Sequence, residues 1–170
     1  LAGQRVEIHG ERRNQSLAFT GAHLGDASLI QHHAAHQLHI EVAHRLRLEG
    51  ELRRALAAGQ LSVAYQPLFD LDTGRVTGFE ALARWHHAEL GTISPAVFIA
   101  VAEEAGLMWP LTDFVLRTAC HQLHAWQSRD GAFAGLNMHV NVSGNDIAHT
   151  SFVARVNSAI VEARLQAQHL

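Results

Sequence analysis

The alternation of hydrophobic and polar positions is clearest in two neighbouring stretches. LSVAYQPLF (61–69) and VTGFEALARW (76–85) have the composition of strands, and the turn-forming residues DLDTGR lie between them. Because this connection is short, the pattern favours an antiparallel hairpin. Side chains of a strand alternate between its two faces, so Glu80, Leu82 and Arg84 share one face of the second strand.

Three later stretches have the 3.6-residue hydrophobic period of amphipathic helices. ISPAVFIAVAEEAGL (93–107) begins a helix with Ser94 as its N-cap and Pro95 at the first helical position. The other two helices are predicted over 110–131 and 151–165. Between them, LNMHVNVS (136–143) alternates as a strand, and its polar face carries four residues: Asn137, His139, Asn141 and Ser143.

A proline-free stretch rich in Ala, Leu, Glu and Arg precedes the hairpin. Residues 26–58 predict a helix or a pair of helices that ends at Gly59, with Gly50 weakening the middle. Their approximate apolar stripe consists of Leu38, Val42, Leu46, Leu52 and Leu56. From residue 61 onward the order strand, strand, helix, helix, strand, helix indicates an α/β fold.

Composition narrows the class of protein. The chain has 170 residues, of which 48% are hydrophobic and 17% charged, so it holds about one domain. A net charge of −3 without a basic block argues against binding to a nucleic-acid polymer. No apolar run approaches the roughly 20 residues that span a bilayer. The single cysteine, Cys120, fits a reducing cytoplasm.

Glu80 and Arg84 are the first candidates for chemistry, because they interrupt an otherwise apolar strand. Their Cα atoms lie about 13 Å apart at roughly 3.3 Å of rise per residue. One interpretation is an edge strand with two solvated charges, or a structural ion pair. The other is a carboxylate ligand for Mg²⁺ or Mn²⁺ beside a guanidinium that binds phosphate. The spacing alone leaves both open.

Asn141 and Gln66 are polar residues in strand-like surroundings. Asn141 has three interpretations: a core amide with its hydrogen bonds satisfied, a turn former at the end of a strand, or a ligand for a hard cation. The last is open because an amide oxygen suits such ions. Gln66 precedes a proline near the end of the first strand, where a turn or surface residue is common. The residues by themselves do not decide between these interpretations.

The chain has 14 histidines, and some of them have helical spacing. His32, His36 and His39 form one such group, and His121 and His124 form another, which raises the question of a zinc site. No cysteine or carboxylate completes either group, so solvated helix faces are the better interpretation.

Several motifs in the right order resemble the EAL domain family of cyclic-di-GMP phosphodiesterases. LRRALAAGQLSVAYQPLFDLDTGRVTGFEALARWHHAELGTISPAVFIAVAEEAGL (52–107) is similar to the start of that family's domain. NMHVNVSGNDI (137–147) resembles its asparagine-bearing third strand. The resemblance implies a TIM-like (β/α) barrel whose first strand is antiparallel. It also implies hydrolysis of cyclic di-GMP to linear pGpG with Mg²⁺ or Mn²⁺.

The resemblance also assigns roles by position. Glu80 resembles the metal-binding carboxylate of the Glu-Ala-Leu signature, and Asn141 resembles the metal-ligating amide. Three further residues resemble substrate contacts, with the arginine on a phosphate: Gln66, Leu82 and Arg84. We therefore expect the first part of a metal-dependent phosphodiesterase site.

The second half of the family's site has no counterpart in this sequence. That half uses a later strand with a metal-binding Glu, an Asp-Asp pair, a catalytic Lys and a further Glu, whereas this chain contains no lysine and stops at EARLQAQHL (162–170). Residues 61–170 are under half of a typical barrel of about 250 residues. We expect an incomplete barrel with no complete catalytic set, and no hydrolysis by this chain alone. The alternative is a non-catalytic module that binds cyclic di-GMP or a protein partner in signalling.

The upstream segments complete the predicted organisation. In this family a helical connector often follows a GGDEF (diguanylate cyclase) domain, and residues 1–25 resemble the last strands of such a domain. We predict a remnant of a preceding domain at 1–25, a helical linker at 26–60 and the N-terminal part of an EAL domain at 61–170. The sequence lacks an initiator methionine, so we expect an excerpt of a longer protein that could be membrane-anchored upstream. An open strand edge predicts self-association or a homodimer.

Overall fold

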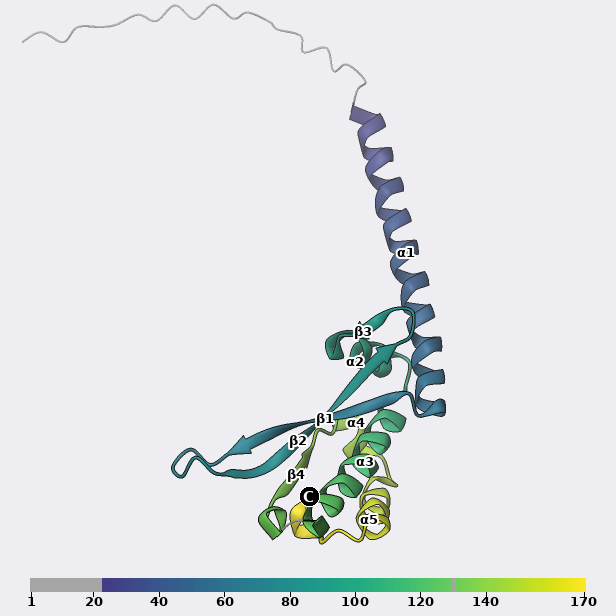
Figure 1. Cartoon of the computed structure of the whole chain (residues 1–170). Helices are drawn as coiled ribbons and strands as arrows, with labels where there is room; N and C mark the ends of the chain where they lie inside the picture. The colour runs from purple at the N-terminus through teal and green to yellow at the C-terminus, as the bar shows by residue number, and fades with distance from the viewer. Residues whose placement is uncertain (1–22, 130) are drawn as a thin grey trace, which may run out of the picture. The chain divides into compact units, whose positions relative to one another are not determined.

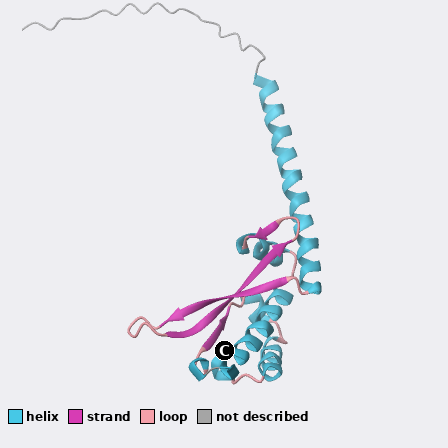
Figure 2. Ribbon diagram, in the orientation of Figure 1, coloured by secondary structure: helices cyan, strands magenta, loops and turns pink. Residues whose placement is uncertain are grey.

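The structure is a computed structural model that describes residues 23–129 and 131–170 (Figures 1 and 2). The remnant expected at 1–25 therefore lies almost wholly outside the described residues. The chain divides between Glu41 and Val42 into two compact units, and the second unit, Val42–Leu170, holds all five residues expected to bind metal or substrate.

The segment before the hairpin is one helix, α1 (His23–Ala58), so Gly50 does not divide it. Its buried face in the second unit consists of Leu48, Leu52 and Ala55. The predicted stripe was wrong in its first half, because Leu46 is 64% exposed and Leu38 and Val42 are exposed as well. Leu46 precedes Leu48 by two residues, which turns its side chain about 200° round the helix and away from the core.

Four strands form the sheet: β1 (Leu61–Phe69), β2 (Val76–His87), β3 (Gly91–Ile93) and β4 (Asn137–Val140). β2 pairs antiparallel with β1 from Val76 to Trp85, which confirms the predicted hairpin. On its other edge β2 pairs with two strands, parallel with β4 and antiparallel with β3. The sheet is open, since β1 and β4 have no further strand beside them in the described part of the chain.

The pairing on that second edge of β2 leaves a gap. β4 pairs with Gly78–Ala81, and β3 pairs only from Trp85 onward. Residues 82–84 therefore have a strand partner on the β1 side alone. β3 is short and was not predicted from the sequence.

The helices that follow are α2 (Pro95–Glu104), α3 (Met108–Arg129), α4 (Gly144–Ala148) and α5 (Phe152–Ala163), with short 3₁₀ helices at Gly131–Phe133 and Ala167–His169. The helices predicted over 93–107, 110–131 and 151–165 are confirmed with small shifts at their ends. The strand predicted over 136–143 was too long, because the residues after Val140 turn into α4. No helix in the described ranges is long and apolar enough to cross a membrane.

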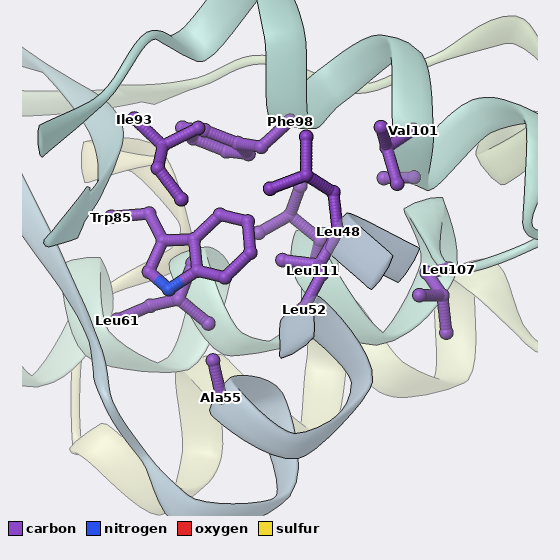
Figure 3. Close-up of a cluster of buried hydrophobic side chains, with 11 residues drawn as sticks. Leu48, Leu52, Ala55, Leu61, Trp85, Ile93, Phe98, Val101, Leu107 and Leu111 are labelled. Carbon is purple, nitrogen blue, oxygen red and sulfur yellow. The ribbon is translucent and has the colours of Figure 1, made fainter. Parts of the chain in front are cut away.

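Two hydrophobic clusters hold these elements together. In the first, drawn in Figure 3, Leu52 of α1 packs with Trp85 of β2 and Phe98 of α2, and the two aromatic rings meet edge to face at 6.1 Å. In the second, α3 packs against the sheet and α5, with Leu123 fully buried and Trp126 against the rings of Tyr65 and Phe79. The odd-numbered residues of β2 from Phe79 to Trp85 thus face the core, which leaves Glu80, Leu82 and Arg84 on the other face.

Candidate functional site

Glu80 and Asn141 meet where β4 ends. Nδ2 of Asn141 donates a hydrogen bond of 2.6 Å to Oε1 of Glu80. The ladder between β2 and β4 ends with Ala81 opposite Val140, so Asn141 is the first residue beyond the strand. The structure therefore brings together, across 61 residues of sequence, the two side chains that the sequence singled out as metal ligands.

Arg84 lies on the same face of β2, four residues further along. Its guanidinium is half-buried, and Nη1 donates to the backbone carbonyl of Ala83 at 2.9 Å. Glu80 and Arg84 do not form an ion pair with each other in the described part of the chain. The interpretation as a structural ion pair between these two residues is therefore wrong, and among the described residues Arg84 has no carboxylate partner.

Gln66 and Leu82 complete the set predicted as substrate contacts. Gln66 is directly opposite Glu80 in the β1–β2 ladder and is exposed, so its side chain shares the face of the carboxylate. Leu82 lies between Glu80 and Arg84 and is half-buried. All five predicted residues thus belong to one sheet region, four on the strands and Asn141 on the turn that follows β4.

A small cavity of about 120 Å³ adjoins this region. It opens at the stretch of β2 that has no strand partner on one side, and Leu82, Arg84 and Asn141 contribute to its wall. Its other lining residues are mostly apolar and come largely from α2 and α3: Ala81, Ala83, Pro95, Ile99, Met108, Leu111, Thr112 and Val115. A positive charge and an amide therefore border an apolar hollow, which suits a ligand with both a flat apolar part and a negative charge.

The donor set fits a hard divalent cation. A carboxylate and an amide oxygen are ligands that Mg²⁺ and Mn²⁺ accept, and Mg²⁺ commonly binds through one or two protein groups plus water and substrate phosphate. The amide nitrogen of Asn141 faces Glu80 in this structure, and a half-turn of that amide directs Oδ1 to the same point. Groups of three or more His, Cys, Asp or Glu that could hold a metal do not occur among the described residues, so the two histidine groups gain no support as a zinc site.

Sequence reasoning missed two residues near this site and assigned no role to a third. His139 is paired with Glu80 in the parallel β2–β4 ladder. The alternation of the strand had already placed it on the same face as Asn141. Thr112 and Asp146 are buried and hydrogen-bonded to each other at 2.9 Å close behind the turn that carries Asn141. The spacing of Ser143 and Asp146 is that of a capping box at the start of a helix. This signal was overlooked because Ser143 was assigned to the predicted strand.

Comparisons with known proteins bear on the family. A family model, the EAL domain, matches residues 49–170. The cyclic di-GMP phosphodiesterase PA2567 of Pseudomonas aeruginosa is 48% identical over 91 residues, which make up 54% of this chain and 15% of that protein. The bifunctional diguanylate cyclase/cyclic di-GMP phosphodiesterase MucR of the same organism is 38% identical over 126 residues, covering 74% of this chain and 18% of that protein.

Solved structures agree with the sequence relatives. The PaMucR phosphodiesterase in complex with cyclic di-GMP superposes with a TM-score of 0.68 at 37% identity. The match covers 73% of this chain and 49% of that one. The EAL enzyme Bd1971 in its cAMP-bound form also gives a TM-score of 0.68, at 23% identity, and supports the fold alone.

These neighbours confirm the predicted TIM-like fold in an incomplete, open form, with an antiparallel first strand. The chain spans about half of the PaMucR structure and much less of the two full-length relatives. With the family model matching 122 residues from 49 to 170, this chain belongs to the EAL domain family and holds part of one such domain.

Proposed function

We propose that this chain carries the metal-binding and phosphate-binding part of a site that hydrolyses cyclic di-GMP to linear pGpG. The observation that carries the proposal is the contact of Glu80 with Asn141 beside Arg84, which has no carboxylate partner among the described residues. The names of the relatives support the substrate, because PA2567 and MucR are cyclic di-GMP phosphodiesterases.

Glu80 and Asn141 are the proposed ligands of Mg²⁺ or Mn²⁺. When bound, such an ion supplies Lewis-acid polarisation of a phosphodiester and activation of water. The chain's own residues hold the ion in place: the carboxylate of Glu80 contributes charge, and the amide oxygen of Asn141 contributes a neutral donor.

Arg84, Gln66 and Leu82 are the proposed substrate contacts. The guanidinium of Arg84 suits a phosphate oxygen because its planar N–H donors match the geometry of phosphate oxygens. Leu82 borders the apolar cavity, which we assign to the base of the nucleotide. Gln66 lies across the ladder from Glu80 and supplies both a donor and an acceptor to the same face.

Binding of cyclic di-GMP by the purified chain tests the proposal. Isothermal titration in Ca²⁺, which replaces the catalytic ion, is expected to show binding that Arg84→Ala weakens at least tenfold, about 1.4 kcal/mol. Arg75→Ala is the matched control, because Arg75 is exposed on the hairpin. Equal affinity of the two variants, or no binding by wild type, would overturn the proposed site.

Measurement of cyclic di-GMP hydrolysis distinguishes a phosphodiesterase from a non-catalytic binding module. We predict that the 170-residue chain with Mn²⁺ binds cyclic di-GMP without cleaving it, because a lysine is absent from its sequence. The same measurement on a longer gene product decides between a phosphodiesterase and a non-catalytic binding module. Appearance of pGpG with the 170-residue chain would show that the residues present suffice for hydrolysis.

Self-association is a further part of the proposal. In the described part of the chain β1 and β4 each leave one edge without a strand partner, and such edges pair readily with other chains. Light scattering of the purified chain is expected to give a mass above that of a monomer of 18.6 kDa. A monodisperse monomer at all concentrations would remove this part of the proposal.

A further inference from the structure

Two polar side chains are buried behind the site, in the described part of the chain: Thr112 is 4% exposed and Asp146 is 2% exposed. A buried carboxylate is costly unless donors surround it. Oδ2 of Asp146 accepts three hydrogen bonds, from Oγ1 of Thr112 at 2.9 Å, from the backbone N–H of Ser143 at 3.0 Å and from Oγ of Ser143 at 2.8 Å. The backbone N–H of Asp146 donates in return to Oγ of Ser143 at 3.1 Å.

This cluster joins three elements. Thr112 belongs to α3, Asp146 belongs to α4, and Ser143 is the N-cap of α4. A serine alone can cap a five-residue helix, so the link to Thr112 exceeds what capping requires. The additional hydrogen bond fixes the beginning of α4 against α3, which itself packs on β4 in the second hydrophobic cluster.

Asn141 lies within the short stretch that this cluster restrains. The ladder holds the chain as far as Val140, and the hydrogen bonds of Asp146 hold it again from Ser143. Only Asn141 and Val142 lie between these two anchors, and both are exposed. Without the second anchor, the turn could swing the amide of Asn141 away from Glu80, because the strand pairing has already ended.

We propose that Asp146 and Thr112 are positioning residues that keep the amide of Asn141 beside the carboxylate of Glu80. The inference rests on the role proposed above for Asn141, but the contact that it concerns is present without an ion. Neither residue touches Glu80 directly. Their effect passes through Ser143 and the two-residue stretch that precedes it.

The test observes the Asn141 carboxamide in ¹H–¹⁵N spectra of the metal-free chain. Asn141→Asp assigns the signal by its loss, and Glu80→Ala gives the position of an amide without its acceptor. Thr112→Val keeps the shape of the side chain but removes the hydroxyl donor. We expect Thr112→Val and Asp146→Ala to move the signal at least half of the way to the Glu80→Ala position, and Thr112→Ser to leave it at the wild-type position.

Controls separate positioning from a general loss of stability. Ile93→Val removes one buried methylene from the first cluster and is expected to lower the melting temperature without moving the Asn141 signal. If Asp146→Ala does not fold, Thr112→Val decides. An unmoved signal in folded Thr112→Val would overturn the inference, even if its melting temperature falls.

A second measurement keeps this inference apart from the proposed function. Mn²⁺ added to wild type is expected to broaden the Asn141 signal selectively. If it does not, the proposed metal site is wrong. The positioning role of Thr112 is then still decided by the position of the Asn141 signal in Thr112→Val.

Discussion

The amide of Asn141, just beyond β4, donates a hydrogen bond to the carboxylate of Glu80 on the parallel strand β2, across 61 residues of sequence. Glu80 lies inside its strand and is fixed on both edges, by the β1 ladder and by the β4 ladder. Asn141 lies beyond the end of β4, so backbone pairing with β2 holds only the residues that precede it. The rigid half of the pair therefore carries the charge, and the adjustable half carries the neutral amide.

Replacing Glu80 by glutamine is expected to weaken Mn²⁺ binding by about tenfold or more, equivalent to about 1.4 kcal/mol, because the ion loses the one full negative charge of its proposed ligands. Electron paramagnetic resonance of free Mn²⁺ measures this directly. Glu89→Gln is the matched control, since Glu89 is exposed and pairs with Arg47 instead. Equal Mn²⁺ affinities for the two variants would contradict the proposed ligand.

A methyl group at Gly78 is expected to destabilise the sheet by roughly 1–3 kcal/mol. A Cβ built there would lie 2.5 Å from the backbone oxygen of Asn137, and backbone cannot move aside as a flexible side chain can. Urea unfolding of Gly78→Ala measures the loss. The control is Gly131→Ala, where the added carbon meets nothing within 4 Å, and an equal loss in both variants would argue against a close β2–β4 approach.

The end of α1 is expected to contribute to the stability of the second unit. Leu52→Ala empties a fully buried position beside Trp85 and Phe98, and such truncations cost about 2–5 kcal/mol. Leu46→Ala, six residues earlier and exposed, is expected to change the free energy of unfolding by less than about 0.5 kcal/mol. Calorimetric melting of both variants checks the difference, and similar effects would mean that α1 does not pack as described.

Stability is expected to fall in alkaline solution because of Cys120. Burial raises the pKa of this thiol to about 11, from 9.0 for an exposed thiol. Between these values the unfolded chain has lost the proton and the folded chain keeps it, so the free energy of unfolding decreases by about 1.4 kcal/mol per pH unit. Below pH 9 this contribution is fully present.

The measurement compares wild type with Cys120→Ala by urea unfolding at pH 8 and pH 10. The difference between the two proteins removes the effect of other titrating groups, and it should shrink or reverse at the higher pH. A difference that is the same at both pH values would mean that the thiol titrates equally in the folded and unfolded states.

The sequence predicted the hairpin and the shared face of Glu80, Leu82 and Arg84 correctly, because period-two alternation is a local property of a strand. It also predicted that Glu80 and Asn141 would act together as metal ligands. That prediction depended on the resemblance to the EAL family, since residue spacing alone does not define which strands pair.

What the sequence could not predict depended on contacts between distant segments. The buried face of α1 was misjudged because Leu46 and Leu52 are equally apolar, and only the packing partners distinguish them. The end of β4 was misplaced because Val142 continues the alternation while Ser143 begins a cap. The cavity beside Arg84 results from two strands sharing one edge of β2, a feature that no local pattern encodes.

The two proposed ligands are contributed by segments so far apart that β3, α2 and α3 must all be synthesised between them. A ribosome that has translated the Glu-Ala-Leu signature has therefore made only half of the proposed ion-binding pair, and the other half emerges after the whole of α3. Proteolysis within α3 would likewise separate the acid from its amide partner unless the two pieces stayed associated. An intact signature tripeptide in a shortened chain is thus no measure of whether a divalent ion can be held.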